Sequence, residues 1–328
     1  MQRVGIIGCG HIFPRHKEAI SANNKDFKLV ATCDIDPYKN ADYEDYKEML
    51  EQMQGKMDLV VIATPNHLHY TMALNALQAG YDILVEKPIA FEAEKVTKIQ
   101  DLADKLGRNA WCVLQVRYNP TVEMLSQALK EELLGNIRSV VFVQRWQRPV
   151  GYFKDWRGML RQGGRSLYEY AIHYLDILQL LFGNPEVKAT QTFNHKHFTI
   201  PFEDTLYSVV EYKDNISGSI EVTVAVEPHN LECSISIMGS KGFVKISGNA
   251  LDVIERAHFE DDILLKKWYD IVNKAGDGVV PNDYGTHVGS CPNHPILYSE
   301  IAQGRGLRIE ESTDSIKFIQ DIYEQEHR

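Results

Sequence analysis

The sequence has little that would set the protein apart from ordinary globular chains. It has only five cysteines, odd in number, widely spaced and without a CxxC pair: Cys9, Cys33, Cys112, Cys233 and Cys291. This pattern is typical of buried thiols in a reducing compartment, and it indicates neither a zinc site nor a disulfide framework, so we expect no metal. No apolar run approaches the roughly 18 residues of a membrane-spanning helix. Met1 leads directly into an apolar segment, which leaves no room for a secretory leader. We expect a cytoplasmic protein.

An excess of positive charge is also absent. The formal net charge is −10, which opposes binding to a nucleic acid but leaves room for a local site for one small anion. Repeats, low-complexity tracts and Pro/Ser-rich linkers are missing as well. The chain has 328 residues, of which 44% are hydrophobic and 24% charged, and this predicts a globular protein of about two domains.

The first third of the chain alternates short apolar segments with amphipathic ones. The expected strands are residues 3–8, 27–34, 58–64, 82–86 and 110–115, and the expected helices follow Pro14 and cover residues 43–53, 68–79 and 92–106. The strands are rich in Val, Ile and Leu without strict alternation, as in strands buried on both faces. The pattern predicts a doubly wound parallel sheet with helices on both sides.

The pattern changes near residue 138. Segments 138–147, 206–214, 216–227 and 231–240 alternate apolar and polar residues with a period of two, and a helix is expected over 166–182. Such alternation is typical of antiparallel strands with one buried face. We expect a second α+β domain with an open, mainly antiparallel sheet, and we divide the chain into domains 1–118 and 119–328.

The stretch RVGIIGCGHIFPRH (3–16) places Gly8 and Gly10 directly after a strand. Asp34 ends the next strand, where an acidic residue takes a ribose hydroxyl in dinucleotide-binding folds. The glycines alone would also suit a plain tight turn. The carboxylate of Asp34 would repel a 2′-phosphate and so favours NAD over NADP, although Lys39 keeps that question open. Phe13 stands where a small residue is usual and would hinder close strand–helix packing.

Three further segments carry candidate chemistry. TPNHLH (64–69) and EKPIA (86–90) follow expected strands, and so lie where open α/β sheets bind ligands. In the expected helix of GGRSLYEYAIHYLDILQLLFG (163–183), Glu169 and His173 stand four residues apart, and Asp176 follows three residues later. Two of these residues also allow a purely structural interpretation. Lys87 would then be a solvated surface lysine, and His173 a core histidine with a structural carboxylate partner.

In this order and spacing, the glycine turn, TPNHLH, EKP and the GG…ExxxHxxD helix resemble the Gfo/Idh/MocA family of NAD(P)-dependent oxidoreductases. The resemblance covers nearly the whole chain. It implies an N-terminal Rossmann domain and a C-terminal α/β domain whose open sheet often joins subunits into homodimers or homotetramers. It also implies that Lys87 and His173 are catalytic, with Glu169 in place of the usual aspartate.

With NAD as the cofactor, the predicted contacts lie in the glycine turn, at the end of the second strand and in the two loops. They are Gly8, Gly10, His11, Ile12, Asp34, Thr64, Pro65, Asn66, His69, Glu86 and Lys87.

Shorter matches point to one branch of the family. FPRH, LQVRYNP, GYFKDWRG and HPILYSEIAQGRG resemble the enzymes that oxidise UDP-linked N-acetylhexosaminuronic acids at C3 for surface polysaccharides, with 2-oxoglutarate as a possible second substrate. The predicted substrate contacts are Arg117, Tyr118, Lys154, Arg157, Arg161, Asp176 and His294, with Arg165 as a further cation for an anionic group. Any single cation could instead serve surface solubility.

The expected reaction follows from these assignments. His173 removes the proton of a sugar hydroxyl while hydride leaves for the nicotinamide, and Lys87 stabilises the developing alkoxide. Three alternatives stay open: a free sugar or inositol dehydrogenase, an NAD-dependent glycoside hydrolase of the same family, and a non-catalytic cofactor-binding protein.

Overall fold

The computed structural model describes residues 1–274 and 292–326, in which the chain forms two compact units. Unit 1 comprises Met1–Gln115, Arg161–Gly164 and Asn293–Lys317, and unit 2 comprises Val116–Leu160, Arg165–Pro292 and Phe318–Arg328. The sequence predicts one division, after residue 118. The first boundary lies three residues from it, but two later segments return to unit 1, because they pack there and not with their neighbours in sequence.

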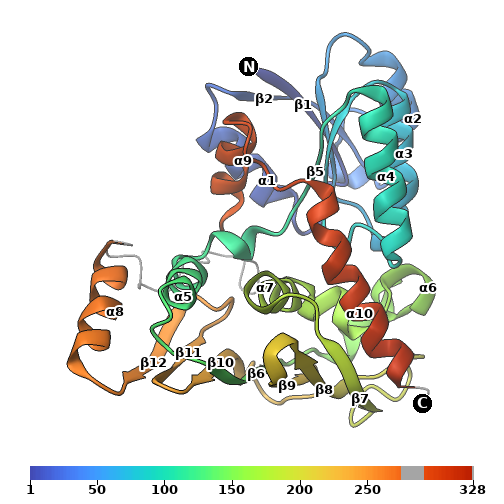
Figure 1. Ribbon diagram of the computed structural model, residues 1–328. Coiled ribbons are helices and arrows are strands. Elements are labelled where there is room, and N and C mark those ends of the chain that lie inside the picture. Colours follow the sequence, from blue (N-terminus) through green and yellow to red (C-terminus); the bar gives the residue numbers. More distant parts are fainter. Residues whose placement is uncertain (275–291, 327–328) are drawn as a thin grey trace. The chain divides into compact units, whose positions relative to one another are not determined.

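Unit 1 contains the predicted doubly wound sheet. Its main elements are β1 (Gln2–Ile7), α1 (Phe13–Ala22), β2 (Phe27–Cys33), α2 (Tyr46–Gln52), β3 (Leu59–Ile62), α3 (His69–Gln78), β4 (Asp82–Val85), α4 (Ala93–Leu106), β5 (Ala110–Cys112), α6 (Leu160–Gly163) and α9 (His294–Ala302). The five strands are parallel in the order β2-β1-β3-β4-β5. In Figure 1, α2, α3 and α4 cover one face of this sheet, and α1 and α9 cover the other.

The core of unit 1 explains why its strands lack alternation. All four residues of β3 are fully buried, as are Ile83, Leu84 and Val85 of β4, since helices cover both faces of the sheet. Helix α4 ends where the sequence provides a cap, because Gly107 takes a left-handed conformation after it, with φ +62°. Local sequence and tertiary burial therefore favour the same elements.

Unit 2 contains a seven-stranded sheet. Its main elements are α5 (Pro120–Lys130), β6 (Ile137–Arg145), a π turn (Leu167–Ala171), α7 (Ile172–Phe182), β7 (Glu186–Phe193), β8 (Thr205–Tyr212), β9 (Ile216–Thr223), β10 (Glu232–Gly239), β11 (Gly242–Ser247), β12 (Val253–Phe259) and α8 (Asp262–Lys274); α10 (Thr313–Gln325) starts in unit 1 and ends here. The strand order is β12-β11-β10-β6-β9-β8-β7. The predicted mainly antiparallel sheet is confirmed, and the one parallel pair is β6 with β9.

One face of this second sheet is packed and the other is open. Helices α5 and α7 lie over the same side of the sheet in Figure 1. On β8 the burial alternates strictly after Leu206, with Tyr207 and Val209 about half exposed. A row of alternating charges crosses five neighbouring strands: Glu221 on β9, Arg145 on β6, Glu232 on β10, Lys245 on β11 and Glu255 on β12, with ion-pair distances of 2.6, 3.1, 3.0 and 3.0 Å.

Short 3-10 helices join the larger elements. They are Pro37–Lys39, Asn66–Leu68, Gln115–Tyr118, Val150–Lys154, Trp156–Gly158, Lys213–Asn215 and Ile309–Ser312.

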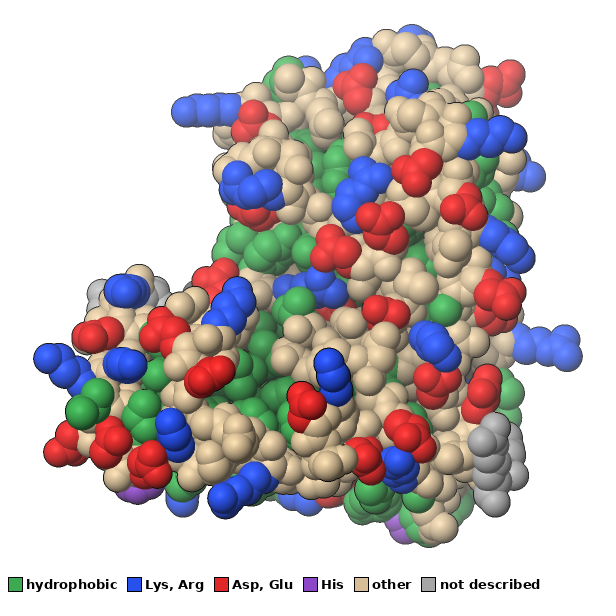
Figure 2. Space-filling view, in the orientation of Figure 1, with side chains coloured by type: hydrophobic (Ala, Val, Ile, Leu, Met, Phe, Trp, Pro, Cys, Tyr) green, Lys and Arg blue, Asp and Glu red, His purple; other side chains and the backbone are tan. Residues whose placement is uncertain are grey.

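Among the described residues, no helix has both the length and the apolar character needed to cross a bilayer. Figure 2 shows acidic and basic side chains interspersed over the face in view.

Candidate functional site

The turn between β1 and α1 is built around two glycines with different tasks. Gly8 has φ +100°, and a Cβ there would lie 2.3 Å from the carbonyl oxygen of Ala63, so only glycine fits against β3. Gly10 is the opposite case, because a Cβ there would meet no atom within 4 Å. The second glycine therefore leaves open space in front of the backbone.

Asp34 lies against this same turn. One carboxylate oxygen accepts the backbone N–H of Cys9 at 2.7 Å, and the other accepts the N–H of Asp36 at 2.9 Å. The acidic residue at the end of β2 is thus fixed beside the glycines by the backbone itself. Burial and the Asp34 charge raise the pKa of the Cys9 thiol to about 11, so this cysteine stays protonated and is no nucleophile at neutral pH.

These residues fit a dinucleotide. The first turn of α1 has no side-chain cap. The N–H groups of Phe13 and Arg15 already donate to the carbonyl oxygens of Gly10 and Ile12, at 3.3 and 3.0 Å, so the feature that suits a pyrophosphate is the open approach to the backbone at Gly10. His11 is exposed, Ile12 half-buried, and Gly10 leaves the approach open. Phe13 is half-buried with the Lys17 ammonium 5.4 Å from its ring centre. The hindrance expected from Phe13 concerned strand–helix packing, and the space in front of Gly10 stays open beside it.

The loops after β3 and β4 are held together by His69. This buried side chain places one ring nitrogen 2.7 Å from the Pro88 carbonyl oxygen and the other 2.8 Å from that of Thr64. Burial lowers the pKa of His69, and a neutral imidazole donates only one hydrogen bond. Its tautomer therefore decides which of the two loops is held more firmly.

Two further contacts shape this part of unit 1. The Asn66 amide donates to the carbonyl oxygen of Gly163 at 2.9 Å. Gly164, at φ +81°, packs so closely on Phe91 that a Cβ would lie 2.7 Å from the ring. The GG pair of the sequence motif therefore contacts both predicted cofactor loops, at Asn66 of TPNHLH and at Phe91 directly after EKPIA. Thr64 and Pro65 are half-buried.

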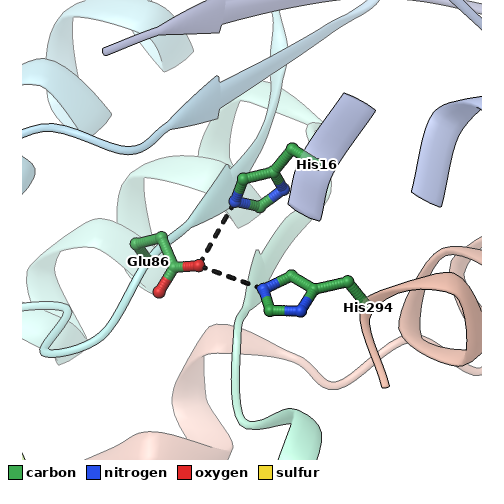
Figure 3. A group of neighbouring side chains, drawn as sticks. All are labelled: His16, Glu86 and His294. Carbon is green, nitrogen blue, oxygen red and sulfur yellow. Dashed lines mark hydrogen bonds and ion pairs between the residues drawn. The ribbon is translucent and has the colours of Figure 1, made fainter. Parts of the chain in front are cut away.

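The EKP segment contains one buried and one accessible charge. Glu86 is 6% exposed and its carboxylate faces His16 and His294 (Figure 3). Lys87 is half-buried. His294 was predicted to contact substrate. The structure instead places it in the interior of unit 1 with no exposed surface, because its ring hydrogen-bonds to Glu86, and we no longer assign substrate contact to it.

In unit 2, the expected helix starts as a π turn, Leu167–Ala171, before α7 begins. Glu169 lies in that turn, and π turns are frequent at functional sites. Its carboxylate accepts the Tyr152 hydroxyl at 3.1 Å and lies 3.8 Å from the Arg157 guanidinium. Burial, with the Glu169 charge, raises the pKa of Tyr152, so this hydroxyl stays protonated and donates. His173 is half-buried at the start of α7.

Two of the predicted substrate contacts pair with each other. Arg117 donates twice to Asp176, at 2.7 Å for each bond, and both side chains are nearly buried. The sequence places Asp176 three residues after His173 on the same helix. In the structure, the carboxylate of Asp176 forms its ion pair with Arg117. Tyr118, next in sequence, is half-buried.

The remaining cations differ in availability. Lys154 and Arg161 are exposed, and Arg157 pairs with Asp155 and stacks on Trp156 and Tyr152. Arg165 bridges the carboxylates of Glu203 and Glu326 at 2.8 and 2.6 Å and lies 3.9 Å above the Tyr323 ring. Its guanidinium therefore serves the packing of unit 2.

Two residues of these clusters were not singled out from the sequence. His16 was quoted only as part of FPRH, although a histidine on the inner face of the first helix is a detectable signal. Tyr152 lies 17 positions from Glu169. No local pattern links two residues so far apart.

Comparison with known proteins identifies the family. The sequence model described as "Oxidoreductase family, NAD-binding Rossmann fold" matches residues 2–114, and the model of the "GFO/IDH/MocA C-terminal domain" matches residues 122–245. The chain belongs to the Gfo/Idh/MocA family. The predicted Rossmann domain and C-terminal α/β domain are thereby confirmed.

Solved and curated relatives extend over nearly the whole chain. WlbA dehydrogenase from Bordetella pertussis, in complex with NADH and UDP-GlcNAcA, is 28% identical with a TM-score of 0.84, covering 99% of this chain and 95% of that chain. The WlbA dehydrogenase from Chromobacterium violaceum, with the same ligands, is 27% identical with a TM-score of 0.86, covering 99% and 94%. D-glucoside 3-dehydrogenase of Escherichia coli is 25% identical, covering 83% of this chain and 87% of its own length.

The family assignment and the NADH-bound neighbours confirm NAD as the cofactor. This Gfo/Idh/MocA protein is an NAD-dependent dehydrogenase.

Proposed function

We propose that this Gfo/Idh/MocA protein oxidises the C3 hydroxyl of a UDP-linked N-acetylhexosaminuronic acid to a ketone, as a step of surface-polysaccharide synthesis. The observation that carries the proposal is the similarity to the two WlbA dehydrogenases, which extends over 99% of the chain and whose structures hold UDP-GlcNAcA together with NADH. The sequence identity to both proteins exceeds 25%, so the similarity supports a related function as well as a shared fold.

The cations of segment 154–161 support an anionic substrate. Lys154 and Arg161 are exposed, and within the described residues neither forms an ion pair. Arg157 is fixed by stacking on Trp156, with its guanidinium carbon 4.6 Å from the ring centre. The planar fork of a guanidinium suits a phosphate or carboxylate group. In a chain of net charge −10, such cations are candidates for the diphosphate or the uronate.

The proposed chemistry assigns one task to each catalytic residue. When bound, NAD supplies the acceptor for the hydride that leaves C3. His173 takes the proton from the C3 hydroxyl as general base. The Lys87 ammonium stabilises the alkoxide, and because that charge grows toward the transition state, the interaction lowers the barrier.

Glu169 acts in this proposal as a positioning residue. Its carboxylate holds the Tyr152 hydroxyl and lies beside Arg157, so it joins the π turn to the segment that carries the proposed substrate cations. Arg117 and Asp176 neutralise each other, and Asp176 lies on α7, the helix that carries His173. Both pairs shape unit 2 around the substrate.

A free sugar is the second candidate substrate. The similarity to D-glucoside 3-dehydrogenase of Escherichia coli covers 83% of the chain and favours a 3-dehydrogenase that needs no nucleotide. In both candidates the hydroxyl chemistry is the same, so the distinction depends on the cations of segment 154–161. A 2-keto acid such as 2-oxoglutarate is proposed as the second substrate, which would take the electron pair back from the reduced cofactor.

We also propose a homodimer or homotetramer. The open face of the sheet of unit 2 presents apolar side chains that are 37 to 51% exposed, namely Tyr207, Val209, Met238 and Phe243. Two of them lie on β8 and two on the neighbouring strands β10 and β11, and exposed apolar side chains on a sheet face are typical of subunit contacts.

A substrate panel tests the proposed reaction. The enzyme is offered UDP-N-acetylglucosaminuronic acid, methyl glucoside, free glucose and myo-inositol, with and without 2-oxoglutarate, while NADH and 3-keto product are followed. We expect turnover of the nucleotide sugar, and we expect Arg157→Met to raise its KM at least tenfold because a charged contact is lost. Lys241→Met, an exposed lysine of the β10–β11 turn, is the matched control and should leave KM unchanged.

Turnover of the free sugars with none of the nucleotide sugar would refute the proposal and favour the second candidate. Glycoside cleavage without net NADH formation would instead indicate the hydrolase chemistry.

A further inference from the structure

Three side chains from distant parts of unit 1 meet at one buried carboxylate. His16 lies on α1, Glu86 follows β4, and His294 begins α9 (Figure 3). The Nε2 atoms of His16 and His294 lie 3.2 and 3.4 Å from the same Glu86 oxygen, Oε1. Both imidazoles are fully buried. The other oxygen, Oε2, accepts the backbone N–H of Lys87 at 3.1 Å.

The hydrogen atoms of this cluster can be assigned one by one. If both Nε2 atoms carry hydrogen, each ring donates to Oε1, and Nδ1 of His16 is left to accept the Tyr298 hydroxyl at 3.0 Å. Glu86 then receives three hydrogen bonds. Burial opposes its charge, but the interactions with His16 and His294 outweigh burial and hold the pKa of Glu86 well below the ordinary value. Burial lowers the pKa of His16, so that ring stays neutral.

Two imidazoles and a carboxylate are also a donor set that zinc or iron accepts, and the ligand atoms lie within 4.8 Å of one another. Among the described residues the cluster has three such donors, one fewer than a closed structural zinc site. The two contacts are hydrogen-bond distances, and the Tyr298–His16 bond directs a proton toward Glu86. We therefore assign protons, and not a metal ion, to the space between these atoms.

The consequence concerns the residue after Glu86. We propose that Glu86 is a positioning residue, whose buried carboxylate fixes the main chain of Lys87 and is itself fixed by His16 and His294. This inference rests on the catalytic role of Lys87 in the proposed function. The Glu86 carboxylate joins α1, the EKP segment and α9. A buried anion therefore fixes the position of the main chain from which the accessible Lys87 side chain extends.

Substitution of His294 tests this assignment, because it removes one donor without touching Lys87 or the glycine turn. In His294→Leu we expect kcat to fall about tenfold with KM for NAD within about twofold, and we expect faster hydrogen exchange in the peptide that spans residues 84–90. His294→Gln keeps an N–H donor of similar reach and should restore both values to near wild type. His229→Leu, an exposed histidine of unit 2, is the matched control.

Each outcome has a distinct meaning. If no tested sugar is oxidised but exchange at 84–90 still rises in His294→Leu and recovers in His294→Gln, the proposed function fails while the positioning role stands. Equal loss in the Leu and Gln variants, or unchanged exchange in both, overturns the inference. One equivalent of zinc or iron in the purified protein, measured by mass spectrometry and lost in His294→Gln, overturns the proton assignment.

Discussion

Lys87 and His173 belong to different units and differ in what holds them. Lys87 follows a buried glutamate at the end of β4, and His173 follows a π turn at the start of α7. Both side chains are half-buried, as expected for groups that must meet a substrate while staying oriented. The proposed roles are an electrostatic one for the lysine and a proton-transfer one for the histidine.

These roles predict specific losses. Lys87→Met and His173→Asn should each lower the rate of hydride transfer by about two to four orders of magnitude while NAD affinity stays near wild type. Glu169→Gln should cost less, because it acts through Tyr152 and Arg157. Single-turnover reduction of bound NAD measures the step directly.

Lys98→Met provides the control, since this lysine is exposed on α4 of the same unit as Lys87. Wild-type speed in either Lys87→Met or His173→Asn would contradict the catalytic assignment.

Single residues were predictable where a local motif defines them. Gly8, Gly10 and Asp34 follow from strand ends and spacing, and the structure places Asp34 against the glycine turn as that spacing indicates. Partners from distant segments were not predictable. Nothing local joins His294 to Glu86 across 208 positions. In the same way, Arg165 bears the charge of an anion-binding residue, but its use depends on Glu203 and Glu326, which only the folded chain brings near.

At the scale of elements, the β1–α1 turn allows a paired test. Gly8→Ala would place a Cβ 2.3 Å from the Ala63 carbonyl oxygen at φ +100°, so we expect a loss of stability of about 1 to 3 kcal/mol. Gly10→Ala meets no atom within 4 Å, so stability should be unchanged while NAD affinity falls at least tenfold, because the added methyl fills the approach to the backbone.

Urea unfolding and calorimetric titration with NAD separate the two effects. Undiminished NAD affinity in Gly10→Ala would show that the cofactor does not lie over this turn.

The elements of unit 1 were largely predictable because burial and sequence agree. Expected strands at 27–34 and 82–86 are observed at Phe27–Cys33 and Asp82–Val85, and the expected helix at 92–106 is observed at Ala93–Leu106. The helix expected over 166–182 differs, because its first turn is a π turn. Apolar periodicity cannot distinguish a single wider turn, since that depends on what the turn must pack against.

At the scale of the whole molecule, buried histidines make stability depend on pH. Burial lowers the pKa of His16 and His69 below the ordinary value, so between these values the unfolded chain binds protons that the folded chain does not. Stability is therefore complete above about pH 6.5 and falls as the pH drops, by up to about 1.4 kcal/mol per pH unit for each histidine. Below the ordinary pKa of glutamate, Glu86 adds to the loss.

Urea unfolding between pH 7.5 and 5.5 measures this slope. His69→Asn should reduce it, whereas His229→Asn, at an exposed position, should not. A stability that is constant over this range would contradict the neutral state of the buried rings.

The overall organisation was predictable in its two sheets but not in the path of the chain between units. The change from buried apolar strands to period-two alternation near residue 138 separates the sheets. Packing of α9 on α1, and of Gly164 on Phe91, joins later segments to unit 1, and a composition shift cannot reveal such returns.

That path also bears on how such a protein can be inherited and rearranged. Because residues 161–164 and 293–317 belong to unit 1 and residues 318–328 return to unit 2, neither unit is encoded by one continuous stretch of gene. A fragment ending at residue 118 would lack α9, leaving a face of α1 bare and Glu86 with one histidine fewer. A single recombination event could therefore not pair this cofactor half with a new substrate half. Exchange would require crossovers at every boundary at which the chain passes from one unit to the other.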